Sequence, residues 1–143
     1  MAEYEWARLR ADELRKYSQD DTVVIVPVAA LEQHGPHLPV MVDSRLVEEV
    51  SKRTASLGGD KGIPIITIPV VWHGLSEHHM PFGGTVTLTS NTFFLVVRDL
   101  IKSISRHGFS KFLILNGHGG NITAAEVCAQ DISMELSLPI VAA

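Results

Sequence analysis

Uninterrupted apolar runs alternate along the chain with segments of helical periodicity, and this alternation predicts the secondary structure. Continuous apolar runs are typical of strands that are covered on both faces. They predict strands over 22–28, 63–71 and 112–115, with shorter strands over 85–89 and from 139 to 141. Apolar residues at helical spacing predict helices over 6–17, 44–57, 90–107 and 122–136.

Capping residues and glycines predict where two of these helices begin and end. Gly58 and Gly59 are expected to end the helix over 44–57, because glycine is favoured just beyond a helix C-terminus. Ser90 is the predicted N-cap of the helix over 90–107, and Gly108 is predicted to stop that helix.

Strands and helices follow one another in alternation, which predicts a single α/β domain over residues 1–143. A three-layer α/β/α sandwich with a mostly parallel central sheet and right-handed crossovers satisfies this order. The sequence ends on the first residues of an apparent strand, so we expect the domain to be incomplete at its C-terminus.

The composition excludes several classes of function. The chain has 143 residues and a net charge of -4, so it offers no general attraction for nucleic acid or an anionic membrane. Cys128 is the only cysteine, which excludes an intrachain disulfide and favours a reducing compartment. No apolar stretch is long enough to span a bilayer, and residues 1–21 lack the apolar core of a signal peptide. We therefore expect a soluble, cytoplasmic protein with a small ligand.

A first polar cluster follows the strand over 22–28. Residues two apart in an extended segment share a face, so Glu32 and His34 can point the same way while Gln33 points to the other side. Asp43 arrives at the start of the next helix, where its carboxylate could bridge two cations. The alternatives are a salt bridge for Glu32, a buried structural role for His34 and a helix-capping role for Asp43.

A second polar cluster, Asn116–Asn121 (NGHGGN), follows the strand over 112–115. In parallel sheets ligands bind beyond the carboxyl ends of the strands, so His118 is predicted to face the same crevice as the first cluster. We expect Asn116, Gly119, Gly120 and Asn121 to contact the substrate, because glycines allow a ligand to approach the backbone closely. The alternatives are a phosphate loop, although neither nucleotide-binding pattern is matched, and an N-capping role for Asn121.

A third polar loop follows the strand over 63–71 and contains Glu77, His78 and His79. These side chains offer up to three metal ligands or proton carriers. A solvated loop with incidental histidines explains them equally well.

Three motifs, in this order, resemble the creatininase family of creatinine amidohydrolases and their relatives. They are LEQHGPHLP at 31–39 followed by VD at 42–43, His79 with FGGT at 82–85, and NGHGGN at 116–121. In the second motif Gly83 replaces a proline of the family pattern. The resemblance covers nearly the whole chain and implies the creatininase-like α/β/α fold.

The resemblance implies a metal-dependent hydrolase that cleaves a carbon-nitrogen bond in a cyclic or linear amide. Carried onto this sequence, Glu32 and His118 would bind one cation, His34 would bind the other, and Asp43 would bridge the two. Zinc, manganese and ferrous iron all suit such ligands. The family also suggests a homo-oligomer, commonly a hexamer.

In such a site a divalent cation lowers the pKa of a bound water to about 7, so that water can attack the amide carbonyl. A general acid must then protonate the leaving nitrogen. His37 and His79 are the two candidates by position, and the sequence does not choose between them.

The sequence departs from the family pattern at two points, and these bear on the substrate and on how much of the site the chain contains. Creatininase continues its NGH motif with a Tyr-Glu pair whose glutamate ligates the second metal, and this chain has Gly120 at that position. This difference argues against creatinine as the substrate more than against hydrolysis. Family members also continue with a His-Ala-Gly segment and a Glu-Thr-Ser segment, which this chain does not match.

Several functional hypotheses therefore stand beside one another. Relatives that deformylate a cofactor precursor or mature a peptide-derived redox cofactor make these amides alternative substrates. A catalytically incomplete, metal-binding member that acts as a binding or assembly subunit is a hypothesis of another class. A third hypothesis is a nucleotide binder that uses the glycines of 117–120 without any metal.

Overall fold

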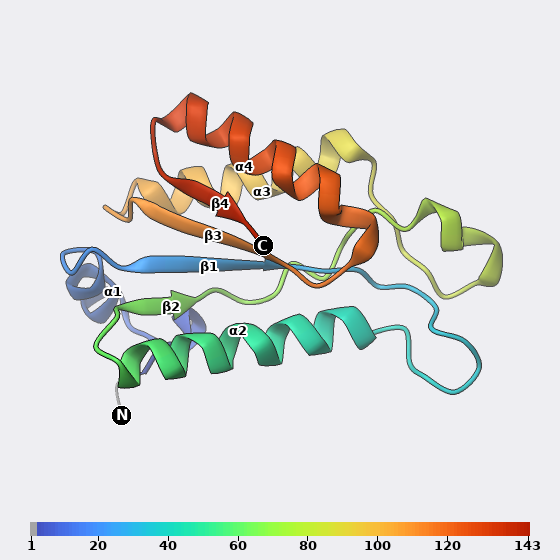
Figure 1. Cartoon of the computed structure of the whole chain (residues 1–143), viewed down its shortest axis with the longest axis horizontal. Coiled ribbons are helices and arrows are strands. Elements are labelled where there is room, and N and C mark those ends of the chain that lie inside the picture. The colour runs from blue at the N-terminus through green and yellow to red at the C-terminus, as the bar shows by residue number, and fades with distance from the viewer. Residues whose placement is uncertain (1–2) are drawn as a thin grey trace.

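Four parallel strands form the central sheet of this protein, which a computed structural model describes over residues 3–143 (Figure 1). The strands lie in the order β2-β1-β3-β4. Their bounds are Val23–Val28 (β1), Ile65–Thr67 (β2), Lys111–Asn116 (β3) and Ile140–Ala142 (β4). The central strands β1 and β3 pair over six residues each and end together, with Val28 opposite Asn116. The polar clusters that follow them therefore begin side by side.

Helices cover both faces of the sheet, which confirms the predicted three-layer α/β/α architecture (Figure 1). Helix α2 (Val42–Asp60) lies on one face, and α3 (Ser90–Ser105) and α4 (Ile122–Leu136) lie together on the other. The remaining helices are α1 (Ala11–Tyr17) and the short 3-10 helices η1 (Trp6–Arg8), η2 (Glu77–Phe82) and η3 (Gly119–Asn121). None of the helices within residues 3–143 combines the length and apolarity needed to cross a bilayer.

The core lies between the sheet and helices α3 and α4. Val24 and Val26 of β1 are fully buried in this core, and so are Phe93, Val97 and Ile101 of α3. The spacing of four residues places these three side chains on one face of the helix. Full burial of each such side chain contributes about 1.5–3 kcal/mol, so this interface holds the strand ends in place.

The prediction that Gly58 and Gly59 end the second helix is wrong, because α2 continues to Asp60. Gly58 is buried, and a Cβ atom there would lie 2.7 Å from Cδ1 of Ile65 in β2. The glycine thus serves helix-strand packing. The chain leaves the helix at Gly62, whose φ of +73° favours glycine.

The helix predicted over 6–17 is interrupted. The segment between η1 and α1 is extended, and the carboxylate of Glu13 accepts a hydrogen bond from the backbone N–H of Arg10 at 2.8 Å. This bond satisfies a donor at the start of α1, so the helix begins after Arg10.

The strands predicted over 63–71 and 85–89 are shorter than expected or absent among the described residues. Strand β2 covers only Ile65–Thr67, since Pro64 and Pro69 on either side cannot donate to the sheet. Segment 85–89 forms only isolated bridges, in which Val86 pairs with Leu31 and Thr87 with Gly74.

The third helix begins at Ser90, the first residue of its predicted range, and ends two residues before its predicted limit. Its N-cap is Thr89 and not Ser90, because the hydroxyl of Thr89 accepts a hydrogen bond from Thr92 N at 3.3 Å. The helix ends at Ser105, three residues before Gly108. The helix predicted over 122–136 is confirmed at both ends.

Candidate metal centre

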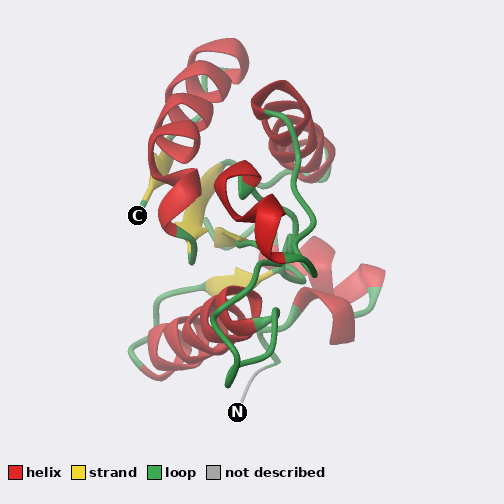
Figure 2. Cartoon of the chain, turned by 90° about the vertical axis from the view of Figure 1, so that its right-hand side faces the viewer, coloured by secondary structure: helices red, strands yellow, loops and turns green. Residues whose placement is uncertain are grey.

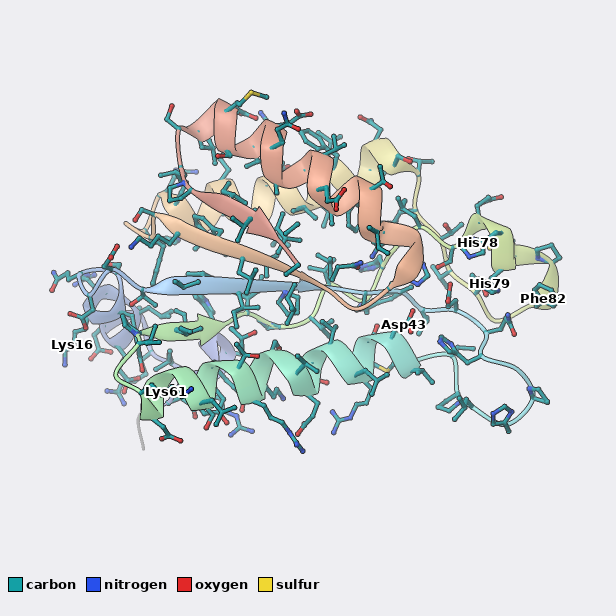
Figure 3. All side chains as sticks on the ribbon, in the orientation of Figure 1. Lys16, Asp43, Lys61, His78, His79 and Phe82 are labelled. Carbon is teal, nitrogen blue, oxygen red and sulfur yellow. The ribbon has the colours of Figure 1, made fainter. Side chains whose placement is uncertain are left out.

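The predicted metal ligands gather beyond the carboxyl ends of β1 and β3, the end of the molecule that faces the viewer in Figure 2. Glu32 and His34 lie in the segment that follows β1, and His118 lies two residues after β3. Asp43 is in the first turn of α2, and Figure 3 shows it on the same side of the molecule as His78 and His79. Three separate elements therefore contribute to one site.

The carboxylate of Asp43 stands between two imidazoles. Its Oδ1 lies 3.1 Å from Nε2 of His34, and its Oδ2 lies 2.8 Å from Nδ1 of His118. Each oxygen thus faces a different histidine, which is the arrangement that a carboxylate bridging two cations requires. The side chains of Glu32, Asp43 and His118, which we call the Asp43 group, offer donor atoms that all lie within 4.8 Å of one another.

Glu32 is a buried carboxylate with incomplete hydrogen bonding. Only 6% of the residue is exposed, and Oε1 lies 3.5 Å from Nδ1 of His118 and 3.7 Å from Nε2 of His79. Its other oxygen, Oε2, is buried and has no hydrogen-bond partner among residues 3–143. A buried carboxylate oxygen normally has a donor or a cation, so this orphaned atom fits a divalent ion bound here.

Hydrogen-bond partners on Nε2 fix the orientation of the His118 imidazole. Its Nε2 lies 3.1 Å from the carbonyl oxygen of Leu75 and 3.3 Å from the hydroxyl of Ser76, which leaves Nδ1 directed at the carboxylates. Asn116 holds the backbone of the same residue, because its Nδ2 donates to His118 O and its Oδ1 accepts from His118 N. Metal-binding histidines usually have a hydrogen-bond partner on the ring nitrogen that does not face the metal, as Nε2 of His118 has here.

Asn121 connects three segments beneath the site. It is fully buried; its Oδ1 accepts from the backbone N–H of Leu75 at 2.9 Å, and its Nδ2 donates to Ala29 O at 2.9 Å. Asn121 is the N-cap residue of α4, as the alternative expected, but its side chain makes no capping hydrogen bond to the helix. The amide instead fixes the loop after β1 to the loop that precedes η2.

Gly117 allows α2 to approach β3 closely. A Cβ atom at this position would lie 2.5 Å from Cβ of Val47 and 3.2 Å from the carbonyl oxygen of Asp43. Because glycine lacks that atom, the first turn of α2 can lie against the end of β3. This contact brings Asp43 within reach of His118.

The two candidate proton donors occupy different surroundings. His79 lies beside Glu32, and its Nδ1 is 2.6 Å from Nε2 of the Gln33 side chain. His37 is exposed, and no hydrogen bond or ion pair joins it to the Asp43 group within the described chain. His78 is also exposed, and its ring lies parallel to that of His118 with centroids 6.3 Å apart.

The four residues predicted to contact the substrate are in different situations. The side chains of Asn116 and Asn121 are engaged within the protein, as described above. Gly119 is exposed, with open space where a Cβ atom would stand, whereas a Cβ atom at Gly120 would meet neighbouring atoms at 2.4 Å. Gly119 is thus the member of this set with free space beside it.

Two contributors to the site had no clear signal in the sequence. Gln33 was expected to point away from its neighbours, yet its side chain contacts His79. Ser76, which is fully buried, reaches His118 from a loop 42 positions away in the sequence. Only the fold brings these pairs together, so no local pattern reveals them.

Comparisons with known proteins agree with this geometry. The family model Creatininase, described as creatinine amidohydrolase, matches residues 7–142. The chain is 35% identical over 103 residues to the mycofactocin precursor peptide peptidase of Mycolicibacterium smegmatis, covering 71% of this chain and 41% of that protein. It is 34% identical over 106 residues to the creatinine amidohydrolase of Pseudomonas putida, covering 71% of this chain and 39% of that protein.

A solved structure of creatinine amidohydrolase (creatininase) superposes with a TM-score of 0.89 at 26% identity, covering 100% of this chain and 58% of that one. Creatininase structures of the same likeness include a mutant of Zn-Zn type and a Mn form, each with a TM-score of 0.88. The chain spans about half the length of the relatives it matches. Since the family match covers nearly the whole chain, this protein belongs to the creatininase family.

Proposed function

We propose that this chain carries the metal centre of an amidohydrolase, which cleaves a carbon-nitrogen amide bond with water. The observation that carries the proposal is the buried Oε2 of Glu32, which lacks a partner within residues 3–143 beside two imidazoles and a second carboxylate. A buried carboxylate oxygen without a partner destabilises the folded protein, whereas in a hydrolytic metal centre the same oxygen coordinates a cation. Family membership supports the same chemistry.

The metal ligands in this proposal are Glu32, His34, Asp43 and His118. Glu32 and His118 would hold one divalent cation and His34 a second, with the carboxylate of Asp43 shared between them, since its two oxygens face different imidazoles. Zinc and manganese are the leading candidates, because related creatininases have Zn-Zn and Mn forms, and iron suits the same donors. When bound, a divalent cation polarises an amide carbonyl and lowers the pKa of water to about 7.

The protein side chains orient the substrate and move the proton. His79 is the better placed general acid of the two candidates, because its Nε2 lies 3.7 Å from Oε1 of Glu32 whereas His37 is exposed. In the proposed step Nε2 of His79 protonates the leaving nitrogen as the carbon-nitrogen bond breaks. Gly119 leaves open space through which the substrate backbone or ring can approach.

The substrate is proposed to be a small amide or a peptide end, and not creatinine. Gly120 has no carboxylate, unlike the position in creatininase that the sequence pattern matches to it. A relative with 35% identity is a peptide peptidase, which supports a peptide bond as the target. A homo-oligomer belongs to the same proposal and is supported by the outer edge of β4, where Val141 is 59% exposed. A cytoplasmic location is proposed with it, because the chain has a single cysteine.

Hydrolysis assays on the purified 143-residue chain test this function. The chain is loaded with Zn²⁺ or Mn²⁺ and offered creatinine, a formylated amine and short peptides, with product amine measured. We expect release of amine from a formylated or peptide substrate, and loss of that activity in Asp43→Asn. Asp99→Asn, which changes an exposed carboxylate on α3, is the control and should keep full activity. A fully metal-loaded chain that hydrolyses none of these amides would overturn the proposal.

A further inference from the structure

A second group of potential ligands lies beside the Asp43 group and shares one residue with it. Glu32, His78 and His79, which we call the η2 group, offer donor atoms that all lie within 4.8 Å of one another. Both histidines belong to the short helix η2, and Figure 3 shows them projecting at the same end of the molecule as Asp43. The structure therefore offers a position for a cation that the family assignment of ligands does not include.

Glu32 is placed to serve both groups. Its Oε1 lies between Nδ1 of His118, 3.5 Å away, and Nε2 of His79, 3.7 Å away. Its Oε2 is buried without a hydrogen-bond partner in the part of the chain that is described. Each of the two oxygens of a carboxylate can coordinate a cation, so Glu32 can bind one cation in the Asp43 group and still have a lone pair for another. The unsatisfied oxygen, on which the proposed metal centre also rests, indicates that Glu32 lacks part of its coordination.

The donors of the η2 group suit a transition-metal ion. Two imidazoles and a carboxylate form a three-ligand set that catalytic zinc sites use, with a fourth position left open. The side-chain amide of Gln33 lies 2.6 Å from Nδ1 of His79, and the opposite ring nitrogen, Nε2, lies 3.7 Å from Oε1 of Glu32. The rings of His78 and His79 are neighbours, with centroids 4.2 Å apart.

Position 120 cannot supply the ligand that the creatininase pattern has there. A Cβ atom on Gly120 would lie 2.4 Å from Nε2 of His118 and 2.4 Å from the carbonyl oxygen of Leu75. The backbone at this position thus has no room for a carboxylate side chain. Any further protein ligand must come from another element, and η2 is the one that brings two imidazoles to Glu32.

We propose that Glu32, His78 and His79 bind a divalent transition-metal ion of their own, beside the ion of the Asp43 group, with Glu32 shared between them. This inference rests on the proposed metal centre. It gives η2 the role of a ligand-bearing element. An ion held there occupies Nε2 of His79, so ion binding by the η2 group and proton donation by His79 are alternative states of this residue.

Metal stoichiometry tests the proposal without reference to activity. Each variant is stripped with chelator and titrated with Co²⁺. Bound metal per chain is then measured by mass spectrometry, and the visible spectrum of Co²⁺ reports the ligand set. We expect the double variant His78→Ala/His79→Ala to bind one equivalent less than the unmodified chain. Asp43→Asn should weaken the two equivalents that its carboxylate would share and keep that of the η2 group, whereas Glu32→Gln should lose the η2 equivalent together with that of the Asp43 group.

His107→Ala removes an exposed histidine near α1, at the opposite end of the molecule, and should bind as many equivalents as the unmodified chain. Far-ultraviolet circular dichroism checks folding. If the double variant unfolds, the single variants His78→Gln and His79→Gln take its place. Each should bind the ion of the η2 group at least about 10-fold more weakly than the unmodified chain.

Unchanged stoichiometry and affinity in the histidine variants would overturn the proposal, and so would loss of every equivalent in Asp43→Asn. Failure of the proposed function is separate, because a chain that binds these equivalents and hydrolyses no amide contradicts only the function.

Discussion

Oδ2 of Asp43 lies 2.8 Å from Nδ1 of His118, although the two residues are 75 positions apart in the sequence. The contact joins the first turn of α2 to the end of β3, and it depends on the missing side chain of Gly117. One carboxylate therefore ties together the two polar clusters that follow the central strands. Its consequences for metal binding can be measured directly.

Metal binding should stabilise the folded chain through Asp43. A ligand that binds only the folded state at 100 times its Kd adds about 2.7 kcal/mol to the free energy of unfolding. We expect Zn²⁺ to raise the thermal midpoint of the unmodified chain, and chelator to reverse the shift. Asp43→Asn should abolish most of it, because this variant removes a charged ligand. Asp99→Asn, in which the carboxylate is exposed, serves as the control; an equal shift in Asp43→Asn would contradict the assignment.

Gly120 and its neighbour Gly119 form a matched pair for testing how tightly the loop after β3 is packed. Gly120→Ala places a Cβ atom 2.4 Å from Leu75 O and from His118 Nε2, so overpacking should cost roughly 1–3 kcal/mol. Gly119→Ala meets nothing within 4 Å and should be nearly neutral. Chemical denaturation of both variants measures the difference. Equal stability of the two would show that the loop at 120 adjusts freely.

Asn121 should contribute to stability through its two buried hydrogen bonds. Asn121→Ala leaves the N–H of Leu75 and the carbonyl of Ala29 without partners, at a cost of about 1–3 kcal/mol for each buried group. Asn91→Ala, at an exposed position on α3, should change the free energy of unfolding very little. Urea denaturation compares the pair, and a loss in Asn121→Ala no larger than in the control would refute the prediction.

The core between the sheet and α3 should be sensitive to cavities. Ile101 is fully buried, so Ile101→Ala should lower the free energy of unfolding by about 2–5 kcal/mol. Leu95 lies on the same helix and is 42% exposed, and Leu95→Ala should cost about 0.5 kcal/mol or little more. The two denaturation midpoints give the comparison. Similar losses would mean that α3 does not pack as described.

Cys128 should make stability fall at high pH. Burial raises the pKa of its thiol from the ordinary 9.0 to about 11. Between these values the unfolded chain has lost a proton that the folded chain keeps, so this contribution is complete below pH 9 and declines as pH rises toward 11. Cys128→Ala should show a shallower decline in urea unfolding between pH 8 and 10.5. Identical slopes would contradict the assigned burial, and fast alkylation of the folded thiol at pH 8 would do the same.

Much of the fold follows from local sequence. The alternation of buried strands and amphipathic helices predicts the three-layer sandwich, and the helix over 122–136 has its predicted limits because its apolar spacing and flanking residues are local features. The errors arise where distant contacts compete with local preference. Gly58 does not end α2, because its missing side chain makes room for Ile65 of β2.

The clusters of histidines and carboxylates at the ends of the parallel strands can be predicted from the sequence, because strand ends and polar clusters both consist of neighbouring residues. How those side chains pair depends on the folded chain. Each of these contacts joins residues from separate segments of the chain. Asp43 lies between two imidazoles, and Glu32 lies between His118 and His79. Gln33 contacts His79, and Ser76 contacts His118. Such distances depend on the register of β1 against β3 and on the close approach at Gly117, which no local pattern encodes.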